Sequence, residues 1–385
     1  MGIMSNTTSL TQFVVNGELT IDEILSCLEK FSFQPIDNSS EESSLGWAVL
    51  DDKDNTGFVA SGDCCRDHYI VFTMRSDTRK VPAAVLRSHL NRAYADFLAE
   101  NPNLNRVPKE DKEAIRDAVK AELLRKVIPT PRVVDVVWDT STGIITLATL
   151  SGKAVEAFGF LFSRTFPTLR HTLFYPFLRA KSVVSKPLAG SLDQINQANS
   201  ENVVDQILQN TWIGEDFLRW LLYHTMESSS EYEVVQEGHQ LQGARFVAFI
   251  DKRLTLVSNC EQTQKLAVTG PQDRFSEVKA ALQEGKTISD ATIFFELDEL
   301  NWNFTLRGTE FVFASFKAPK VKIDREAVDQ GLEAQGMFLE KMMLLESGLQ
   351  LFDSILATFL AQRLSEDWPG IDKQIDDWFR EPKAA

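Results

Sequence analysis

The chain has 385 residues, of which 43% are hydrophobic and 25% charged, the composition of a globular protein long enough for two or three domains of about 150 residues each. This composition excludes a disordered chain and a coiled-coil rod. The 40 Lys and Arg residues are outnumbered by 55 Asp and Glu residues, and the resulting net charge of −15 would by itself repel a polyanion.

The sequence indicates neither a membrane anchor nor a disulfide framework. No apolar run reaches the ~18 residues of a membrane span, and the first ten residues lack the pattern of a signal peptide, so we expect a cytoplasmic protein. The cysteines match no zinc-ligand spacing and are expected to be reduced thiols; they are Cys27, Cys64, Cys65 and Cys260.

The charge is distributed unevenly along the chain. Residues 1–63 carry a net charge of −9, whereas residues 75–132 carry +5, with 13 basic and 8 acidic residues. Residues 157–192 hold five basic residues and no acid, and the balance returns to −7 over 193–322 and −7 over 323–385. Such an asymmetry is typical of a protein that presents one basic surface to a polyanion while the rest stays soluble.

The first 130 residues predict a helix, a small sheet and a helical pair. The capping box Thr20-Ile21-Asp22-Glu23 opens the helix, and short extended runs over 46–50, 57–60 and 68–74 predict antiparallel strands. Apolar residues at helical spacing after Pro82, and again over 109–126, predict a helical hairpin over 82–127 that is rich in Lys and Arg.

The remaining elements alternate between strands and helices. Predicted strands cover 133–138, 144–148, 245–250, 254–257, 265–268, 291–297, 302–306 and 311–316. Predicted helices cover 153–162, 203–209, 215–226, 274–282 and, as one or two acidic amphipathic helices, 325–364. We therefore predict an α+β fold with antiparallel sheets and flanking helices.

The expected domain organisation has four parts. An N-terminal α+β region spans 1–188, and a linker rich in Gly, Ser, Asn and Gln spans 189–202. A second α+β region spans 203–322, and an acidic helical region spans 323–385.

The sequence contains no recognised catalytic motif. A phosphate loop, a Gly-rich dinucleotide turn, a His-Glu-x-x-His pair and a nucleophile elbow are all missing, and the five His residues are scattered, so we expect no catalytic residue, metal or cofactor. Acidic pairs such as Glu215 with Asp216, or Glu296 with Asp298 and Glu299, are one route to Mg²⁺-dependent nuclease chemistry. A helix N-terminus and a strand turn explain these acids more simply.

Aromatic residues are interleaved with arginines over 158–179, a pattern that resembles a stacking surface for single strands. Phe158, Phe160 and Phe162 alternate within an apolar stretch, and we expect all three to be buried.

The order of several short motifs resembles the recombination-associated RdgC family. After the first helix come Ser32-Phe33-Gln34-Pro35, Leu45-Gly46-Trp47 and the run 57–62, and then Arg79 to Leu86, the charged helices and Trp138 to Gly143. Further on, Gln272-Asp273, the run 281–287, the strand 291–298 and the run 321–326 resemble the family's C-terminal half. Each motif is weak alone, and it is their order over residues 10–365 that carries the resemblance.

The resemblance implies a head-to-head homodimer closed into a ring, with double-stranded DNA passing through a basic central hole without sequence preference. Such proteins restrain RecA-dependent recombination and are associated with the nucleoid. The family's basic position before its helix start corresponds to Lys80, and its Gln-Asp pair to Gln272 and Asp273. The segment after the second charged helix, 127–132, is short and lacks the family's phenylalanine, and the chain has additions near 186–240 and at its C-terminus.

The residues expected to contact DNA are the basic residues of the two positive segments together with the glutamine that the resemblance implies. They are Arg75, Arg79, Lys80, Arg87, Arg92, Lys109, Lys112, Arg116, Lys120, Arg125, Lys126, Arg132, Arg164, Arg170, Arg179, Lys181 and Gln272. Contacts of this kind would be made mainly to phosphates, which position a duplex without reading its sequence. Single-stranded DNA remains a second possible ligand.

Two other functions stay open on the sequence alone. The first is a Mg²⁺-dependent nuclease that uses the scattered carboxylates. The second is an interaction scaffold that binds a partner protein through its C-terminal amphipathic helices and does not bind DNA.

Overall fold

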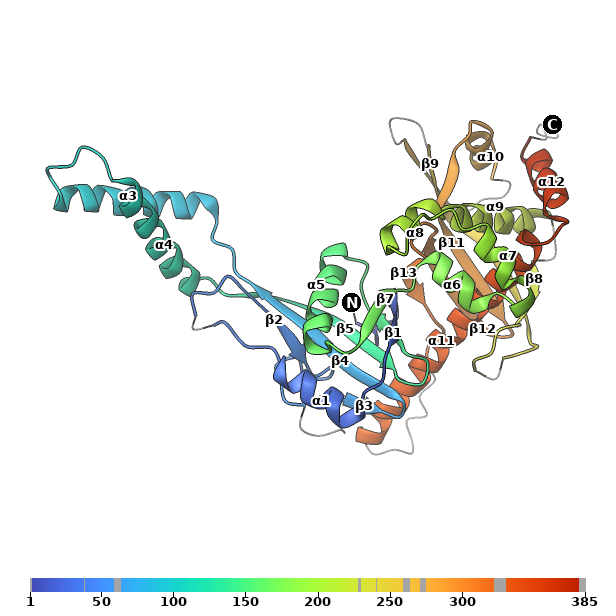
Figure 1. The fold of residues 1–385 in the computed structure, drawn as a ribbon, viewed down its shortest axis with the longest axis horizontal. Coiled ribbons are helices and arrows are strands. Elements are labelled where there is room, and N and C mark those ends of the chain that lie inside the picture. The colour runs from blue at the N-terminus through green and yellow to red at the C-terminus, as the bar shows by residue number, and fades with distance from the viewer. Residues whose placement is uncertain are drawn as a thin grey trace. The chain divides into compact units, whose positions relative to one another are not determined.

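The structure is a computed structural model that describes residues 2–37, 39–58, 64–227, 230–239, 241–258, 264–270, 275–321 and 330–380. It has the predicted α+β class, with antiparallel strands and flanking helices (Figure 1). The chain divides into two compact units: unit 1 comprises 1–15, 142–155 and 171–385, and unit 2 comprises 16–141 and 156–170. Each unit is described by itself.

Unit 2 contains a sheet in the order β5-β4-β2, with β3 paired to β4. Its elements are α1 (Ile21–Lys30), β2 (Ser43–Ala48), β3 (Cys65–Arg66), β4 (Tyr69–Thr78), α3 (Ala83–Glu100), α4 (Lys109–Lys126), β5 (Thr130–Asp139) and most of α5 (Gly152–Thr165). The capping box of α1 is present as predicted, with Thr20 accepting from the Glu23 amide and Glu23 bound to the Thr20 amide.

Trp47 on β2 anchors the core of unit 2. The residue is fully buried, and its indole Nε1 donates a 2.8 Å hydrogen bond to Thr165 Oγ1 of α5. Its ring lies 5.1 Å from that of Phe72 on β4 and 6.1 Å from that of Phe158 on α5, both at edge-to-face angles. These contacts fix α5 on the sheet.

Unit 1 is built on the strand order β10-β9-β11-β12-β13-β1-β6. The strands are β1 (Thr8–Asn16), β6 (Ile144–Leu147), β7 (Arg170–Leu173), β8 (Glu231–Glu233), β9 (Arg245–Val257), β10 (Lys265–Thr269), β11 (Thr287–Leu297), β12 (Leu300–Arg307) and β13 (Val312–Lys317). The first strand of the chain pairs with the last, with Thr8 opposite Phe316. The N-terminal residues therefore complete a sheet whose other strands lie near the end of the sequence.

The helices of unit 1 are α6 (Pro176–Val183), η1 (Lys186–Leu188), α7 (Ala189–Gln194), α8 (Val203–Gln209), α9 (Trp212–Glu227), α10 (Ser276–Gln283), α11 (Gln330–Arg363) and α12 (Trp368–Arg380). α9 packs on β9 and β11, and α11 packs on α6 and α9. The Phe352 ring of α11 lies 5.0 Å from that of Phe313 and 5.6 Å from that of Phe311, which makes α11 the central helix of this core.

Among the described residues, one helical stretch, 334–363 in α11, is long and apolar enough to cross a membrane by length and composition, with a mean hydropathy of 1.3. The fold buries 72% of the 18-residue window with this hydropathy, and the core helix of a soluble protein meets the same criterion.

Three sequence predictions about the fold need correction. Residues 189–202 are not an extended linker, because they include α7 and Asn196 is hydrogen bonded to Asn210 and Gln206. Residues 57–58 lie in no strand, and 59–60 fall outside the described residues. The chain also divides at 15, 141, 155 and 170 instead of near 188, because β1 pairs with β13 and β6.

Candidate nucleic-acid interface

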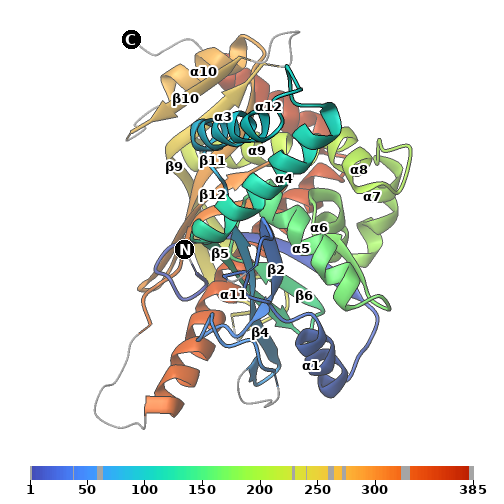
Figure 2. The same cartoon turned by 90° about the vertical axis from the view of Figure 1, so that its left-hand side faces the viewer.

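The helices α3 and α4 form an insertion between two paired strands. Thr78, the last residue of β4, is the partner of Thr130, the first residue of β5, so the chain leaves and re-enters the ladder at a single rung. The two helices lie side by side beyond this rung in both views (Figures 1 and 2). Their bounds agree with the hairpin predicted over 82–127.

Prolines and local hydrogen bonds set the ends of both helices. Pro82 and Pro108 precede the first helical residues, where a missing backbone N–H costs nothing. At the C-terminus of α3, the Asn101 side chain donates a 2.9 Å hydrogen bond to the Phe97 carbonyl. The sequence therefore defines this hairpin locally, with little dependence on the rest of the fold.

The hairpin has almost no core of its own. No residue of α3 is buried, and only Leu123 and Leu124 are buried in α4. The half-buried residues of α3 recur at spacings of three and four, which puts them on one face; they are Leu86, Leu90, Ala93, Tyr94, Phe97 and Leu98. Five residues of α4 are also half-buried, Lys120 among them, and the other residues of both helices are exposed.

One face of α4 carries four basic side chains, Lys109, Lys112, Arg116 and Lys120. Their spacing of three, four and four residues keeps them within about 80° around the helix axis, at ~100° per residue. Lys109, Lys112 and Arg116 are exposed, whereas Lys120 is half-buried and forms an ion pair with Glu42. The Lys112 ammonium lies 5.8 Å from the Tyr94 ring centroid, which links this basic face to α3.

An acidic face adjoins the basic one. Glu110, Glu113 and Asp117 follow the same spacing about 90° further around α4, and all three are exposed. Near the C-terminus, Lys126 binds Glu122 at 2.5 Å, and this contact lowers the pKa of the Glu122 carboxyl below its ordinary value. The positive charge of α4 is thus a property of one face and not of the helix as a whole.

Other predicted contact residues lie on the surface around the hairpin. Lys80, Arg87, Arg92, Arg125 and Arg132 are exposed. Arg132 is the partner of Ser76 in the β4–β5 ladder, two residues beyond the closing rung. Among the described residues, none of these five side chains forms an ion pair, so they add to the accessible charge of unit 2.

Two predicted contact residues of unit 2 serve the fold instead. Arg79 exposes only 5% of its surface and donates a 2.7 Å hydrogen bond to the Ser39 carbonyl, so the prediction that it contacts DNA is wrong. Arg75 lies 4.4 Å from the Phe33 ring centroid and binds Asp77 and Asp54. The hydrogen bonds that Arg75 donates to Asp77 are the main reason that the pKa of Arg75 lies above its ordinary value.

The basic segment 157–192 is not one surface. Arg164 and Arg170 are exposed in unit 2, whereas Lys181 lies in unit 1 and binds Asp193 at 2.7 Å. Arg179 is 1% exposed and donates hydrogen bonds to Asp353, at 2.6 and 3.1 Å, and to Gln12. Arg179 is therefore a core residue of unit 1, which contradicts its predicted role in DNA binding. Gln272 lies outside the described residues.

Phe160 corrects another prediction and adds a residue that the sequence reasoning missed. The segment is helical, so Phe158 and Phe162, four residues apart, are buried, whereas Phe160 is 59% exposed. The Arg164 guanidinium lies 5.4 Å from the Phe160 ring and 5.8 Å from the Phe31 ring. The four-residue spacing of Phe160 and Arg164 places both side chains on one face of a helix, and this spacing could have predicted their contact from the sequence.

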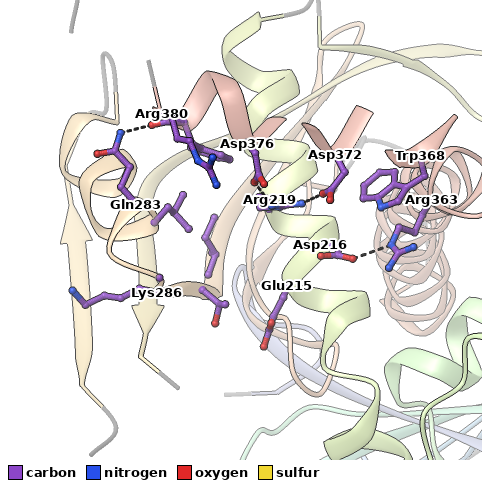
Figure 3. Close-up of a pocket in the computed structure, with 15 residues that line it drawn as sticks. Glu215, Asp216, Arg219, Gln283, Lys286, Arg363, Trp368, Asp372, Asp376 and Arg380 are labelled. Atoms are coloured by element: carbon purple, nitrogen blue, oxygen red, sulfur yellow. Dashed lines mark hydrogen bonds and ion pairs between the residues drawn. The ribbon is translucent and has the colours of Figure 1, made fainter. Parts of the chain in front are cut away.

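Asp216, one of the acids considered for nuclease chemistry, is held in an ion pair. Glu215 and Asp216 line a pocket of about 580 Å³ in unit 1, drawn in Figure 3. Asp216 accepts a 2.9 Å hydrogen bond from Arg363, and Arg219 pairs with Asp372 and Asp376. Burial raises the pKa of both the Glu215 and the Asp216 carboxyls.

The second acidic group lies at a turn. Leu297 pairs with Leu300, so Asp298 and Glu299 form the two-residue connection between β11 and β12, with Asp298 at φ 51°. Within the described ranges, no three His, Cys, Asp or Glu side chains come together in a way that could hold a metal ion.

These features define an α+β protein with a charged two-helix insertion in an antiparallel ladder. A family model described as RdgC, putative exonuclease, matches residues 8–194, a range that contains the whole hairpin. By this match the chain belongs to the RdgC family, as the motif order in its sequence predicted, and at the family level it is a recombination-associated DNA-binding protein. No curated protein matches the chain.

Proposed function

We propose that the protein binds DNA without sequence preference, as a non-catalytic homodimer that encircles the duplex and restrains RecA-dependent homologous recombination. We place this activity in the cytoplasm, in association with the nucleoid. The basic face of α4 carries the proposal, because its four cations recur along about 17 Å of helix, at ~1.5 Å per residue. Clustered cations of this kind bind phosphates and release counterions, which provides affinity that is independent of base sequence.

The net charge of −15 does not oppose this function. Screening at physiological ionic strength acts over about 8 Å, so acidic surfaces further from the duplex contribute little repulsion. The homodimer is proposed from the resemblance to the RdgC family.

The test is a triple charge reversal, Lys109→Glu, Lys112→Glu and Arg116→Glu, with binding to two unrelated 30-base-pair duplexes measured by fluorescence anisotropy. Losing three phosphate contacts should weaken binding on the order of 100-fold at 0.1 M salt and reduce the slope of log K against log salt by roughly 3. The loss should be equal for both duplexes. An affinity that does not depend on salt, or that differs strongly between the duplexes, would contradict the proposal.

Two control variants sharpen this test. Lys153→Glu with Lys373→Glu changes exposed lysines of unit 1 and should leave the affinity for DNA within about twofold. Glu110→Gln, Glu113→Gln and Asp117→Asn remove the acidic face of α4 and should tighten binding. In a RecA strand-exchange assay, the wild-type protein should inhibit and the triple reversal should not.

The family description also names a putative exonuclease, which keeps a catalytic function as a second candidate. End-labelled duplex and single-stranded DNA incubated with Mg²⁺ and purified protein should remain intact under the proposal. Degradation that disappears in Asp298→Asn with Glu299→Gln, or in Asp216→Asn, would establish the nuclease instead.

A further inference from the structure

A second charged pocket lies in unit 1, and all of its lining residues fall outside the range 8–194 that the family model matches. It has a volume of about 540 Å³ and is formed by the N-terminal segment, the residues that follow β13 and one turn of α11. Its lining residues include Asn6, Thr7, Lys317, Lys320, Met337 and Lys341. Three lysines from two parts of the sequence thus converge on one cavity.

Lys341 is an unusual residue for its position. Only 5% of its surface is exposed, and its neighbours on α11, Phe338 and Met342, are 0% and 2% exposed. Across the part of the chain that the structure describes, no carboxylate lies within ion-pair distance of its ammonium. Burying a cation without a counter-charge costs several kcal/mol, and such groups are usually paired or have a binding role.

The residues that the structure describes around Lys341 do not supply a counter-charge for its ammonium group. Among the described residues, no Asp or Glu lines the pocket, and burial lowers the pKa of the Lys341 ammonium. The pocket in Figure 3 differs, since two of its three arginines, Arg219 and Arg363, each bind an aspartate of the same pocket. Within the described ranges, the residues that line the lysine pocket therefore supply no negative charge to neutralise it.

We propose that this pocket binds a small anion that carries two or more phosphate-type charges, such as an inorganic polyphosphate or the phosphate chain of a nucleotide. Three ammonium groups supply the positive charge, while Asn6 and Thr7 add hydrogen-bonding groups. Met4, Pro319 and Met337 form an apolar wall that suits the base of a nucleotide. The volume lies within the range of small-molecule sites, about 300–1,000 Å³.

The burial of Lys341 favours a small ligand over a DNA duplex. A duplex presents its phosphates on a stiff convex surface, and a lysine that is 95% buried within a cavity is out of reach of that surface. A free anion can enter the cavity and contact all three ammonium groups. None of these lysines belongs to the proposed DNA surface, so the two proposals stand independently.

The test measures binding of tripolyphosphate, pyrophosphate and ATP to the full-length protein by isothermal titration calorimetry. Saturable binding in the micromolar range is expected, with at least a tenfold loss in Lys341→Met and in Lys320→Met. Lys153→Met, an exposed lysine of the same unit, is the matched control and should bind as the wild-type protein does. Lys320→Met covers the case in which Lys341→Met fails to fold, because Lys320 is exposed.

The outcomes separate the alternatives. Tripolyphosphate binding as tight as that of ATP assigns the site to the anion alone, and at least tenfold tighter binding of ATP assigns it to a nucleotide. No saturable binding up to millimolar concentrations, or equal binding in the Lys320 and Lys341 variants, would overturn the proposal. So would a loss of duplex affinity in Lys320→Met as large as that of the α4 triple reversal, because the lysines would then belong to the DNA surface.

Discussion

The hairpin and α11 are both helical, but the hairpin exposes most of its side chains to solvent, whereas α11 packs in the core of unit 1. α3 and α4 have 18 residues each and bury only two side chains between them, and their surfaces are dominated by charge. α11 has 34 residues, and its stretch from Leu349 to Leu360 packs against the aromatic core of unit 1. A helix without a core can direct its charges outward, whereas a helix inside the core determines the stability of its unit.

We expect substitutions in α11 to cause the largest losses of unfolding free energy. Phe352→Ala removes a ring that contacts Phe313 and Phe311, and it should cost about 3–5 kcal/mol of unfolding free energy, because the cavity cannot collapse between two packed layers. Leu90→Ala on the half-buried face of α3 should cost about 1 kcal/mol or less. Urea denaturation measures both, and equal losses would contradict the difference between the regions.

Replacing Arg179, a polar residue, should lower the unfolding free energy almost as much as replacing Phe352. Arg179→Met leaves the half-buried Asp353 carboxylate without its cation and should cost up to about 3 kcal/mol near pH 7. Burial already raises the pKa of Asp353, and removing the arginine raises it further. A carboxyl whose folded pKa is raised destabilises the fold above that pKa and not below its unfolded value, ~3.9.

The stability lost in Arg179→Met should therefore be recovered as the pH falls from 7 towards 4. Adding Asp353→Asn should restore much of the stability at pH 7, and denaturation curves across this pH range measure both effects. If Arg179 were a DNA-contact residue, Arg179→Met would instead weaken DNA binding at unchanged stability.

The smallest expected changes in stability come from replacing two glycines of α11 with alanine. A Cβ at Gly348 would lie 2.6 Å from Trp302 Cδ1 and 2.8 Å from Phe316 Cζ, so Gly348→Ala should cost about 1–3 kcal/mol. At Gly336 a Cβ would meet nothing within 4 Å, and Gly336→Ala should stabilise the protein by about 0.5–1 kcal/mol through helix propensity. Thermal unfolding of the two variants should shift in opposite directions.

The sequence predicted best those elements that are defined locally. Pro82, Pro108 and the stop at Asn101 sit within or next to the helices that they delimit, so the hairpin bounds needed no tertiary information. The capping box at Thr20 is equally local. The family resemblance was also predictable, because the order of its motifs is a property of the chain itself.

The failures involve partners that are distant in sequence. Asp353 lies 174 residues from Arg179, so counting charges along the chain could not show that this arginine is internal. The division into units depends on the pairing of Thr8 with Phe316, which no local pattern specifies. The sequence did not point to Lys341, because a basic residue within a long apolar helix resembles a solvent-facing position until its neighbours are known.

The single rung that closes the hairpin has a consequence for how this protein can change over evolution. Thr78 and Thr130 are direct partners, and opposed residues of antiparallel strands lie only about 5 Å apart. A short turn could span that distance, so the intervening 51 residues can lengthen, shorten or be exchanged between relatives without altering the register of the strands on either side. The hairpin can therefore change in length and charge while the strands β4 and β5 keep their register.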